Sequence, residues 1–152
     1  MAGRSATAAV PASEKATTQV RDVMLLMGDL LRDLRGSIDV LAARHGLTAP
    51  LADLLWQIEP DHPLPMRSAA DRISCDPSNV TFLADRLEER GLVERRANPV
   101  DRRVKLLALT DEGLHVREQL LAEVVAASPF GALSATDLAA LRRLLQKVAR
   151  AS

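Results

Sequence analysis

The feature that most constrains this 152-residue chain is a change of hydrophobic period near its middle. From Val80 to Leu87, apolar residues recur at steps of three and four, which is the spacing of one helix face. Asp76 stands where an N-cap belongs and Pro77 where a helix begins. Two strand-like runs, 92–96 and 104–109, follow around the polar loop 97–103. This segment therefore predicts a capped helix that leads into a β-hairpin.

Helical patterns flank this segment on both sides. A long apolar stripe runs from Val20 to Leu41 on a helix that is expected to stop at Gly46, and Thr48 is expected to cap a second helix. A short helix is expected over 66–73, joined to the capped helix by a three-residue turn. Thr110 is expected to cap the next helix, and a capping box beginning at Ser134 is expected to open the last one. The positions expected to face inward are Leu51, Leu54, Leu55, Ile58, Met66, Ala69, Ala70, Ile73, Leu114, Leu120, Leu121, Val124, Val125, Leu138, Leu141, Leu144, Leu145 and Val148.

This order of elements is that of a winged helix-turn-helix. The predicted fold is mainly α with a small β-hairpin: a winged lobe over 48–110, with helices over 14–47 and 111–152. Residues 1–13 are mostly small or polar and are expected to form a mobile tail. The end helices are rich in Leu, and a chain of this length has little to cover them. We therefore expect them to be dimerisation helices that pack on a second copy of the chain.

Composition excludes several classes of protein. The 20 Lys and Arg residues balance the 20 Asp and Glu residues, which argues against coating nucleic acid by charge alone. A single cysteine excludes an intramolecular disulfide, and the three histidines show no metal-ligand spacing. No nucleophile–base set or phosphate loop is visible, so neither an enzyme nor a cofactor is expected. No apolar run has the length of a membrane span and no secretory signal is visible, so we expect a cytoplasmic protein with no membrane partner.

Positive charge is concentrated on the predicted hairpin. Residues 90–105 hold six basic and two acidic side chains, a net charge of +4 in a chain whose total is zero. This distribution suits phosphate binding, and an arginine at a hairpin tip can enter the minor groove of DNA. Asp101 could hold that guanidinium in a fork. The alternative is a solvated turn with local ion pairs.

The capped helix carries a polar face opposite its apolar stripe. There Asn79 suits adenine, Phe82 suits thymine methyl groups, and Arg86 suits guanine or phosphate. An exposed Phe indicates contact with a partner, although a solvated amphipathic surface remains the alternative. The candidate DNA-binding residues are Pro77, Ser78, Asn79, Thr81, Phe82, Arg86, Arg95, Arg96, Asp101, Arg102 and Arg103.

The run from Asp76 to Val93, followed by Asp101-Arg102-Arg103 and by Leu109-Thr110-Asp111-Glu112-Gly113, resembles the MarR family of bacterial transcriptional regulators. The resemblance implies an obligate homodimer with interleaved end helices, which represses transcription by binding double-stranded DNA at a palindromic operator. The helix from Pro77 would be the recognition helix. Arg103 would enter the minor groove with Asp101 as its partner, and Arg102 would lie near the DNA backbone.

The resemblance also implies a small lipophilic or phenolic effector, bound between the dimerisation helices and the lobe. The candidate ligand-binding residues are Met24, Met27, His45, Trp56 and His62, each of which could equally be structural. Phe82 departs from the Arg or polar residue that members often carry in the recognition helix. Cys75 is either a small packed residue or a redox switch. The alternative function is a winged-helix module that binds another protein through Phe82 without binding DNA.

Overall fold

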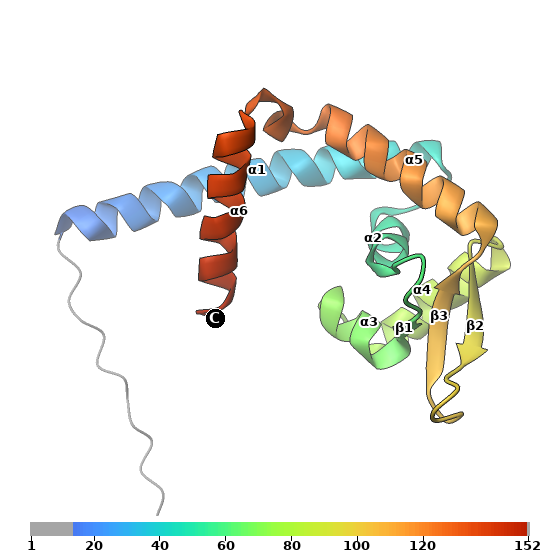
Figure 1. Cartoon of the computed structure of the whole chain (residues 1–152). Helices are drawn as coiled ribbons and strands as arrows, with labels where there is room; N and C mark the ends of the chain where they lie inside the picture. Colours follow the sequence, from blue (N-terminus) through green and yellow to red (C-terminus); the bar gives the residue numbers. More distant parts are fainter. Residues whose placement is uncertain (1–13, 152) are drawn as a thin grey trace, which may run out of the picture. The chain divides into compact units, whose positions relative to one another are not determined.

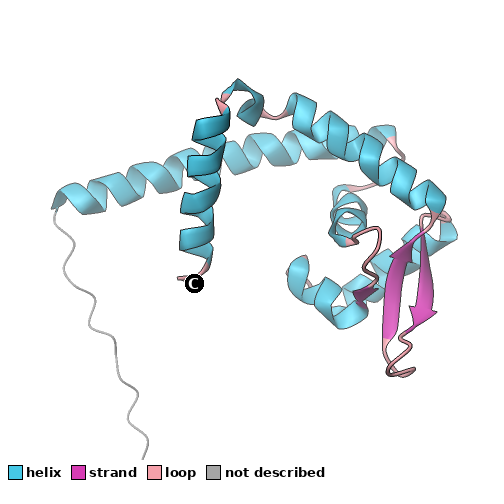
Figure 2. Cartoon of the chain, viewed as in Figure 1, coloured by secondary structure: helices cyan, strands magenta, loops and turns pink. Residues whose placement is uncertain are grey.

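The computed structural model describes residues 14–151 and confirms the predicted fold class, mainly α with a small sheet (Figures 1 and 2). The predicted tail, 1–13, lies outside the described residues. The elements are α1 (Glu14–Arg44), α2 (Ala49–Gln57), β1 (Leu64–Pro65), α3 (Met66–Arg72), α4 (Pro77–Glu89), β2 (Val93–Ala97), β3 (Lys105–Leu109), α5 (Asp111–Ala127), the 3-10 turn η1 (Pro129–Ala132) and α6 (Ala135–Ala149).

The chain divides into two compact units, residues 1–34 and 35–152, and the division falls inside α1. In the described part of the first unit, α1 is a continuous helix whose apolar residues are largely exposed. Met24 is 67% exposed and Leu31 is 48% exposed. The predicted boundaries of the winged lobe, 48 and 110, remain a prediction.

The core of the second unit lies where α2, α3, α4 and the sheet meet. All four apolar positions predicted to face inward on α2 and its C-cap are buried, as are Val80, Leu83, Ala84 and Leu87 of α4. Met66 and Ile73 pack at the edge of this core. The apolar stripe of α4 is thus fully covered, which fixes the opposite face of the helix outward.

The predicted hairpin is the β2–β3 pair, antiparallel, with Val93 opposite Leu109 and Ala97 opposite Lys105. A third strand, β1, pairs with the other edge of β3 through Leu64 and Pro65. Sequence reasoning missed β1 because two residues are too few to show a period, and its Pro indicated only a break. A proline is tolerated there because β1 is an edge strand, where a missing N–H leaves no ladder bond unmade.

Two of the predicted helix caps are confirmed and two are only partly correct. The Thr110 hydroxyl accepts the Gly113 N–H at 3.0 Å, and the Ser134 hydroxyl accepts the Asp137 N–H at 3.1 Å. Thr48 and Asp76 do occupy N-cap positions, but neither side chain accepts a capping hydrogen bond. At α4 the Asp76 backbone carbonyl accepts the N–H groups of residues 79 and 80 instead. Pro77 has no N–H that needs a partner.

The inward faces predicted for α5 and α6 are only partly correct. Leu120 is buried, but Val125 is 61% exposed, and α6 has no buried residue. On α6, Leu144 is 56% exposed and Leu145 is 45% exposed. The amphipathic pattern is therefore real, but a single copy of the chain does not cover these faces.

The Thr110–Gly113 segment locks the start of α5 onto the base of the hairpin. The Thr110 hydroxyl donates to the Gly91 carbonyl at 2.6 Å, and the Thr110 N–H donates to the Leu92 carbonyl at 3.2 Å. A Cβ atom added at Gly113 would lie 1.7 Å from the Leu92 carbonyl oxygen. Only glycine therefore allows α5 to approach the hairpin this closely.

We expect Gly113→Ala to lower the free energy of unfolding by about 3 kcal/mol, because a backbone atom must move to make room. Urea unfolding followed by circular dichroism measures this loss. The control is Gly36→Ala on α1, where a Cβ meets nothing within 4 Å. That change should raise stability by about 0.5–1 kcal/mol, since alanine favours a helix over glycine. Equal unfolding midpoints for the two variants would contradict this account of the motif.

Candidate nucleic-acid interface

The outward face of α4 lies where the sequence predicted. Ser78, Asn79, Thr81 and Phe82 are all exposed, and 54% of the Phe82 surface is open to solvent. Because the buried stripe occupies the opposite side, these residues form a continuous edge that nothing else in the second unit covers. A helix of ordinary diameter with one free edge matches the width of the DNA major groove.

Phe82 and Arg86 form a stacked pair one helical turn apart. The Arg86 guanidinium carbon lies 5.2 Å from the centroid of the Phe82 ring. Arg86 also donates to a Glu89 carboxylate oxygen at 2.8 Å. A guanidinium over an aromatic face is attracted by the ring quadrupole, so the ring limits the motion of a long side chain.

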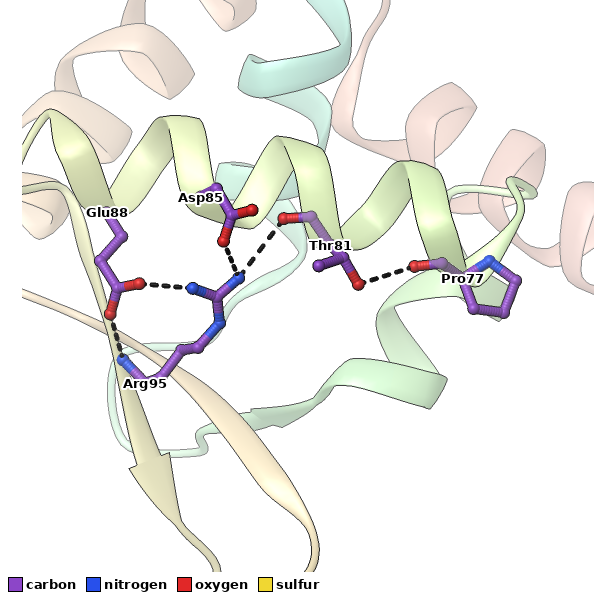
Figure 3. A network of polar contacts seen from close by, with 5 residues as sticks. All are labelled: Pro77, Thr81, Asp85, Glu88 and Arg95. Carbon is purple, nitrogen blue, oxygen red and sulfur yellow. Dashed lines mark hydrogen bonds and ion pairs between the residues drawn. The ribbon is translucent and has the colours of Figure 1, made fainter.

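Thr81 is bonded within its own helix. Its hydroxyl donates to the Pro77 carbonyl at 3.0 Å (Figure 3). This is the backbone hydrogen bond that Thr commonly makes one turn back along a helix. The hydroxyl proton of Thr81 is therefore already used, and its oxygen remains only as an acceptor.

Arg95 joins β2 to α4 (Figure 3). Its guanidinium donates to Asp85 and to Glu88, each at 2.5 Å, and to the Thr81 carbonyl at 3.3 Å. Its backbone N–H donates to the other Glu88 oxygen at 3.1 Å. Burial lowers the pKa of this guanidinium, but the hydrogen bond and charge of Asp85, and then those of Glu88, outweigh it and raise the pKa above its ordinary value. Arg95, which its charge predicted to contact DNA, is therefore hydrogen-bonded to α4 within the domain.

The hairpin loop is tied by local hydrogen bonds. The Asn98 side chain accepts the Val100 N–H at 2.9 Å, and Asp101 accepts the Arg103 N–H at 3.0 Å. The predicted fork between Asp101 and the Arg103 guanidinium is absent from the described residues. Instead, the carboxylate holds the Arg103 backbone, which fixes where the side chain leaves the loop.

The positive charge of the hairpin is unevenly compensated. Arg95 is paired as above, and Arg96 donates to Glu94 at 2.6 Å. Within residues 14–151, no ion pair involves Arg102, Arg103 or Lys105. The uncompensated cations are therefore at the loop and at the start of β3, where they face solvent.

A pocket of about 490 Å³ opens beside α4, within the second unit. Among the residues that line it are Arg35, Ile38, Asp39, Trp56, Cys75 and Asn79. Of the five residues predicted to bind a ligand, only Trp56 lines this pocket. Sequence reasoning did not identify Arg35 and Asp39, because aromatic, Met and His residues are the ones expected to contact an apolar ligand. The available signal was a pair of opposite charges spaced i, i+4 beside the apolar stripe of α1.

The other predicted ligand-binding residues lie elsewhere. His45 is half-buried, and its Nε2 lies 3.3 Å from a carboxylate oxygen of Glu123 on α5. His62 is exposed and lies 3.6 Å from the Glu59 carboxylate. Met24 and Met27 are exposed on the first unit. The contact of His45 with Glu123 agrees with the structural alternative that the sequence left open.

Cys75 is half-buried in the turn between α3 and α4 and packs against the core. Its Sγ donates a weak hydrogen bond to the Asp76 carbonyl at 3.6 Å. This packing agrees with a structural role, while its position on the pocket wall leaves the thiol within reach of a ligand there.

Residues 14–151 contain no group of three or more His, Cys, Asp or Glu side chains placed to hold a metal ion. None of the described helices combines the length and the apolar character that crossing a bilayer requires.

Three packed helices followed by a β-hairpin, with one face of the third helix exposed, define a winged helix-turn-helix domain. A model of the MarR family matches residues 47–105. The HTH-type transcriptional repressor MdtR of Bacillus subtilis is 34% identical over 101 residues, which is 66% of this chain and 65% of MdtR. The HTH-type transcriptional regulator MhqR of the same bacterium is 24% identical, and the match spans 63% of its length. The matches thus span slightly under two thirds of these curated relatives.

Solved structures extend the likeness over more of the chain. The structure of CouR from Rhodococcus jostii RHA1 bound to p-coumaroyl-CoA is 32% identical, with a TM-score of 0.75, and the match covers 84% of this chain and 92% of CouR. A MarR-family transcriptional regulator from Rhodococcus sp. RHA1 is 30% identical, with a TM-score of 0.73, and the match covers 88% and 96% of the two chains. The chain belongs to the MarR family, as the resemblance predicted. MdtR, MhqR and the protein from Rhodococcus sp. RHA1 are named as transcriptional repressors or regulators, which agrees with the expectation of a non-enzymatic protein.

We expect Arg95→Ala to lower the free energy of unfolding by about 1–2 kcal/mol. It removes a guanidinium that is 24% exposed and leaves two carboxylates of α4 close together. Arg96→Ala is the matched control, because that side chain is 57% exposed and bonds only to Glu94 among the described residues. The control should cost less than about 0.5 kcal/mol. Urea unfolding of both variants measures the difference, and equal losses would show that Arg95 does not fasten β2 to α4.

Proposed function

We propose that this protein is a homodimeric transcriptional regulator that represses by binding a palindromic DNA operator. The observation that carries the proposal is the combination of a free edge on α4 with uncompensated cations on the adjoining hairpin. α4 contacts β2 directly, so both features belong to one rigid lobe. Neither feature is needed for the core, which uses only the opposite face of α4.

In this proposal α4 is the recognition helix in the major groove. Asn79, near the start of the helix, pairs with a base edge, and Phe82 contacts a base further along the groove. Ser78 binds phosphate at the start of the helix, where the helix dipole favours an anion. Thr81 acts as an acceptor, since its proton is engaged by Pro77.

The hairpin is the wing in this proposal. Arg103 enters the minor groove, and Asp101 supports it through the Arg103 backbone. Arg102 and Arg96 lie near the phosphates, where positive charge releases counterions. Arg95 is a positioning residue, because its guanidinium bonds to Asp85 and Glu88 of α4.

A second copy of the chain would complete the molecule. α6 exposes Leu138, Leu144 and Leu145, and α1 exposes a run of apolar residues, which together are more than a lone soluble chain usually leaves open. Two-fold symmetry would then set the two recognition helices about one turn of DNA apart.

The pocket beside α4 would hold a small, largely apolar aromatic effector. Its volume is in the range of small-molecule sites, and Trp56, Ile38 and Leu83 supply apolar walls. The relative CouR was solved with p-coumaroyl-CoA. Asn79 of α4 is part of the pocket wall, so a bound effector would contact the helix proposed to read DNA. Binding of the effector would then weaken the binding of α4 to DNA, and the protein would leave the operator.

DNA binding is tested by measuring affinity for operator duplex across salt concentrations. The logarithm of the association constant should fall by about 0.9 per neutralised phosphate for each tenfold rise in salt. Arg103→Ala should weaken binding by about 1–3 kcal/mol. Arg150→Ala, which removes the same charge at the end of α6, is the control and should leave affinity unchanged. An affinity for duplex DNA that changes neither with salt concentration nor with Arg103→Ala would refute the proposal.

Dimerisation is tested by Leu144→Glu, which places a charge on the exposed apolar face of α6. Sedimentation should show a shift toward monomer by at least tenfold in the dissociation constant, because burying an unpaired carboxylate is costly. Gln146→Glu adds the same group to the polar face of the same helix and should leave the dimer intact. A folded wild-type monomer at micromolar concentration would contradict the proposal.

A further inference from the structure

The Phe82–Arg86 pair, in which the Arg86 guanidinium stacks on the Phe82 ring, is an unusual surface feature. The chain has two phenylalanines, and the other, Phe130, is half-buried. Phe82 exposes 54% of its surface in the middle of a helix whose apolar stripe is on the other side. Packing within the described residues therefore does not account for this ring.

The pair is organised for contact before any partner arrives. The ring shields one face of the Arg86 guanidinium at 5.2 Å, and Glu89 holds one of its nitrogens at 2.8 Å. A guanidinium has five N–H donors in one plane, so donors at its edge remain available. A stacked side chain also loses less rotamer freedom on binding than a free one.

We infer that the Phe82–Arg86 pair specifies a thymine and a guanine on neighbouring base pairs of the operator. This inference rests on the proposed function, because it requires α4 to lie in the major groove. There thymine presents a methyl group, which an apolar ring can contact, and guanine presents the O6 and N7 acceptors that arginine binds in bidentate fashion.

The spacing of the pair supports neighbouring base pairs. The 5.2 Å between ring and guanidinium exceeds one base-pair step of about 3.4 Å and is shorter than two steps. With the pair aligned along the groove, its two side chains therefore contact adjacent base pairs. The pair acts as one reading unit because it is already stacked.

The test begins with selection of bound sequences from a random duplex DNA library by the full chain. The consensus should contain a thymine next to a guanine in each half-site. Replacing that thymine by deoxyuridine removes only the methyl group and should weaken binding about fourfold, the factor for one buried methyl. Replacing the guanine by 7-deazaguanine removes one acceptor and should weaken binding about tenfold. Deoxyuridine outside the half-sites is the control and should have no effect.

Variants then assign each base to its side chain. Phe82→Ala should bind the thymine and deoxyuridine duplexes equally, while Phe82→Leu should keep the preference for thymine because it remains apolar. Arg86→Ala should keep the preference for thymine and lose the one for guanine. All three should retain salt-dependent binding to nonspecific duplex, since the wing is intact.

Failure of this inference is distinguishable from failure of the proposed function. A consensus without the thymine–guanine step, or a Phe82→Ala variant that still prefers thymine, would overturn the inference while DNA binding stands. If Arg86→Ala lowers the salt slope by about one unit and keeps the guanine preference, Arg86 binds phosphate and the guanine assignment is wrong. Absence of any salt-dependent duplex binding would overturn both.

Discussion

The one-sided burial of α4 is the constraint on which the rest of the structure depends. Val80, Leu83, Ala84 and Leu87 are covered by α2, α3 and the sheet, so the helix cannot rotate without exposing apolar surface. Covering those four side chains contributes several kcal/mol at about 25 cal/mol per Å². The same packing that stabilises the lobe therefore aims the opposite edge, with Asn79 and Phe82, away from it. The buried face of α4 stabilises the lobe, and the exposed face carries the residues proposed to contact DNA.

The hairpin is coupled to that helix at two points. Arg95 bonds to the outer carboxylates of α4, and Thr110 and Gly113 hold the start of α5 against residues 91 and 92, which lead into β2. Between them these contacts restrain the base of the wing, while the loop beyond stays exposed and positively charged. In the proposed function, a restrained base with an exposed loop would let the loop cations contact phosphate without disturbing α4.

Prediction from the sequence was accurate where the signal was local. The caps at Thr110 and Ser134, the stripe of α4 and the two strands of the hairpin were all correctly identified, because each depends on residues within one turn or one strand. Several of the misses were nonlocal. β1 exists only because β3 offers it an edge, and the pocket wall combines residues from α1, α2 and α4. The number of charges in the hairpin does not indicate that Arg95 forms an ion pair with Asp85, ten residues earlier in the chain.

By itself the sequence determined the order of the elements, the faces that α2 and α4 bury and the concentration of positive charge after Arg90, since periodicity and composition follow from neighbouring residues alone. It also determined that Phe82 would be exposed. The tertiary structure decided which cations are free and which are engaged, and that Asp101 holds a backbone N–H rather than a guanidinium. Which cations are engaged depends on side chains apart in the chain, such as Arg95 and Asp85, and the Asp101–Arg103 bond depends on the conformation of the loop; neither follows from periodicity or composition.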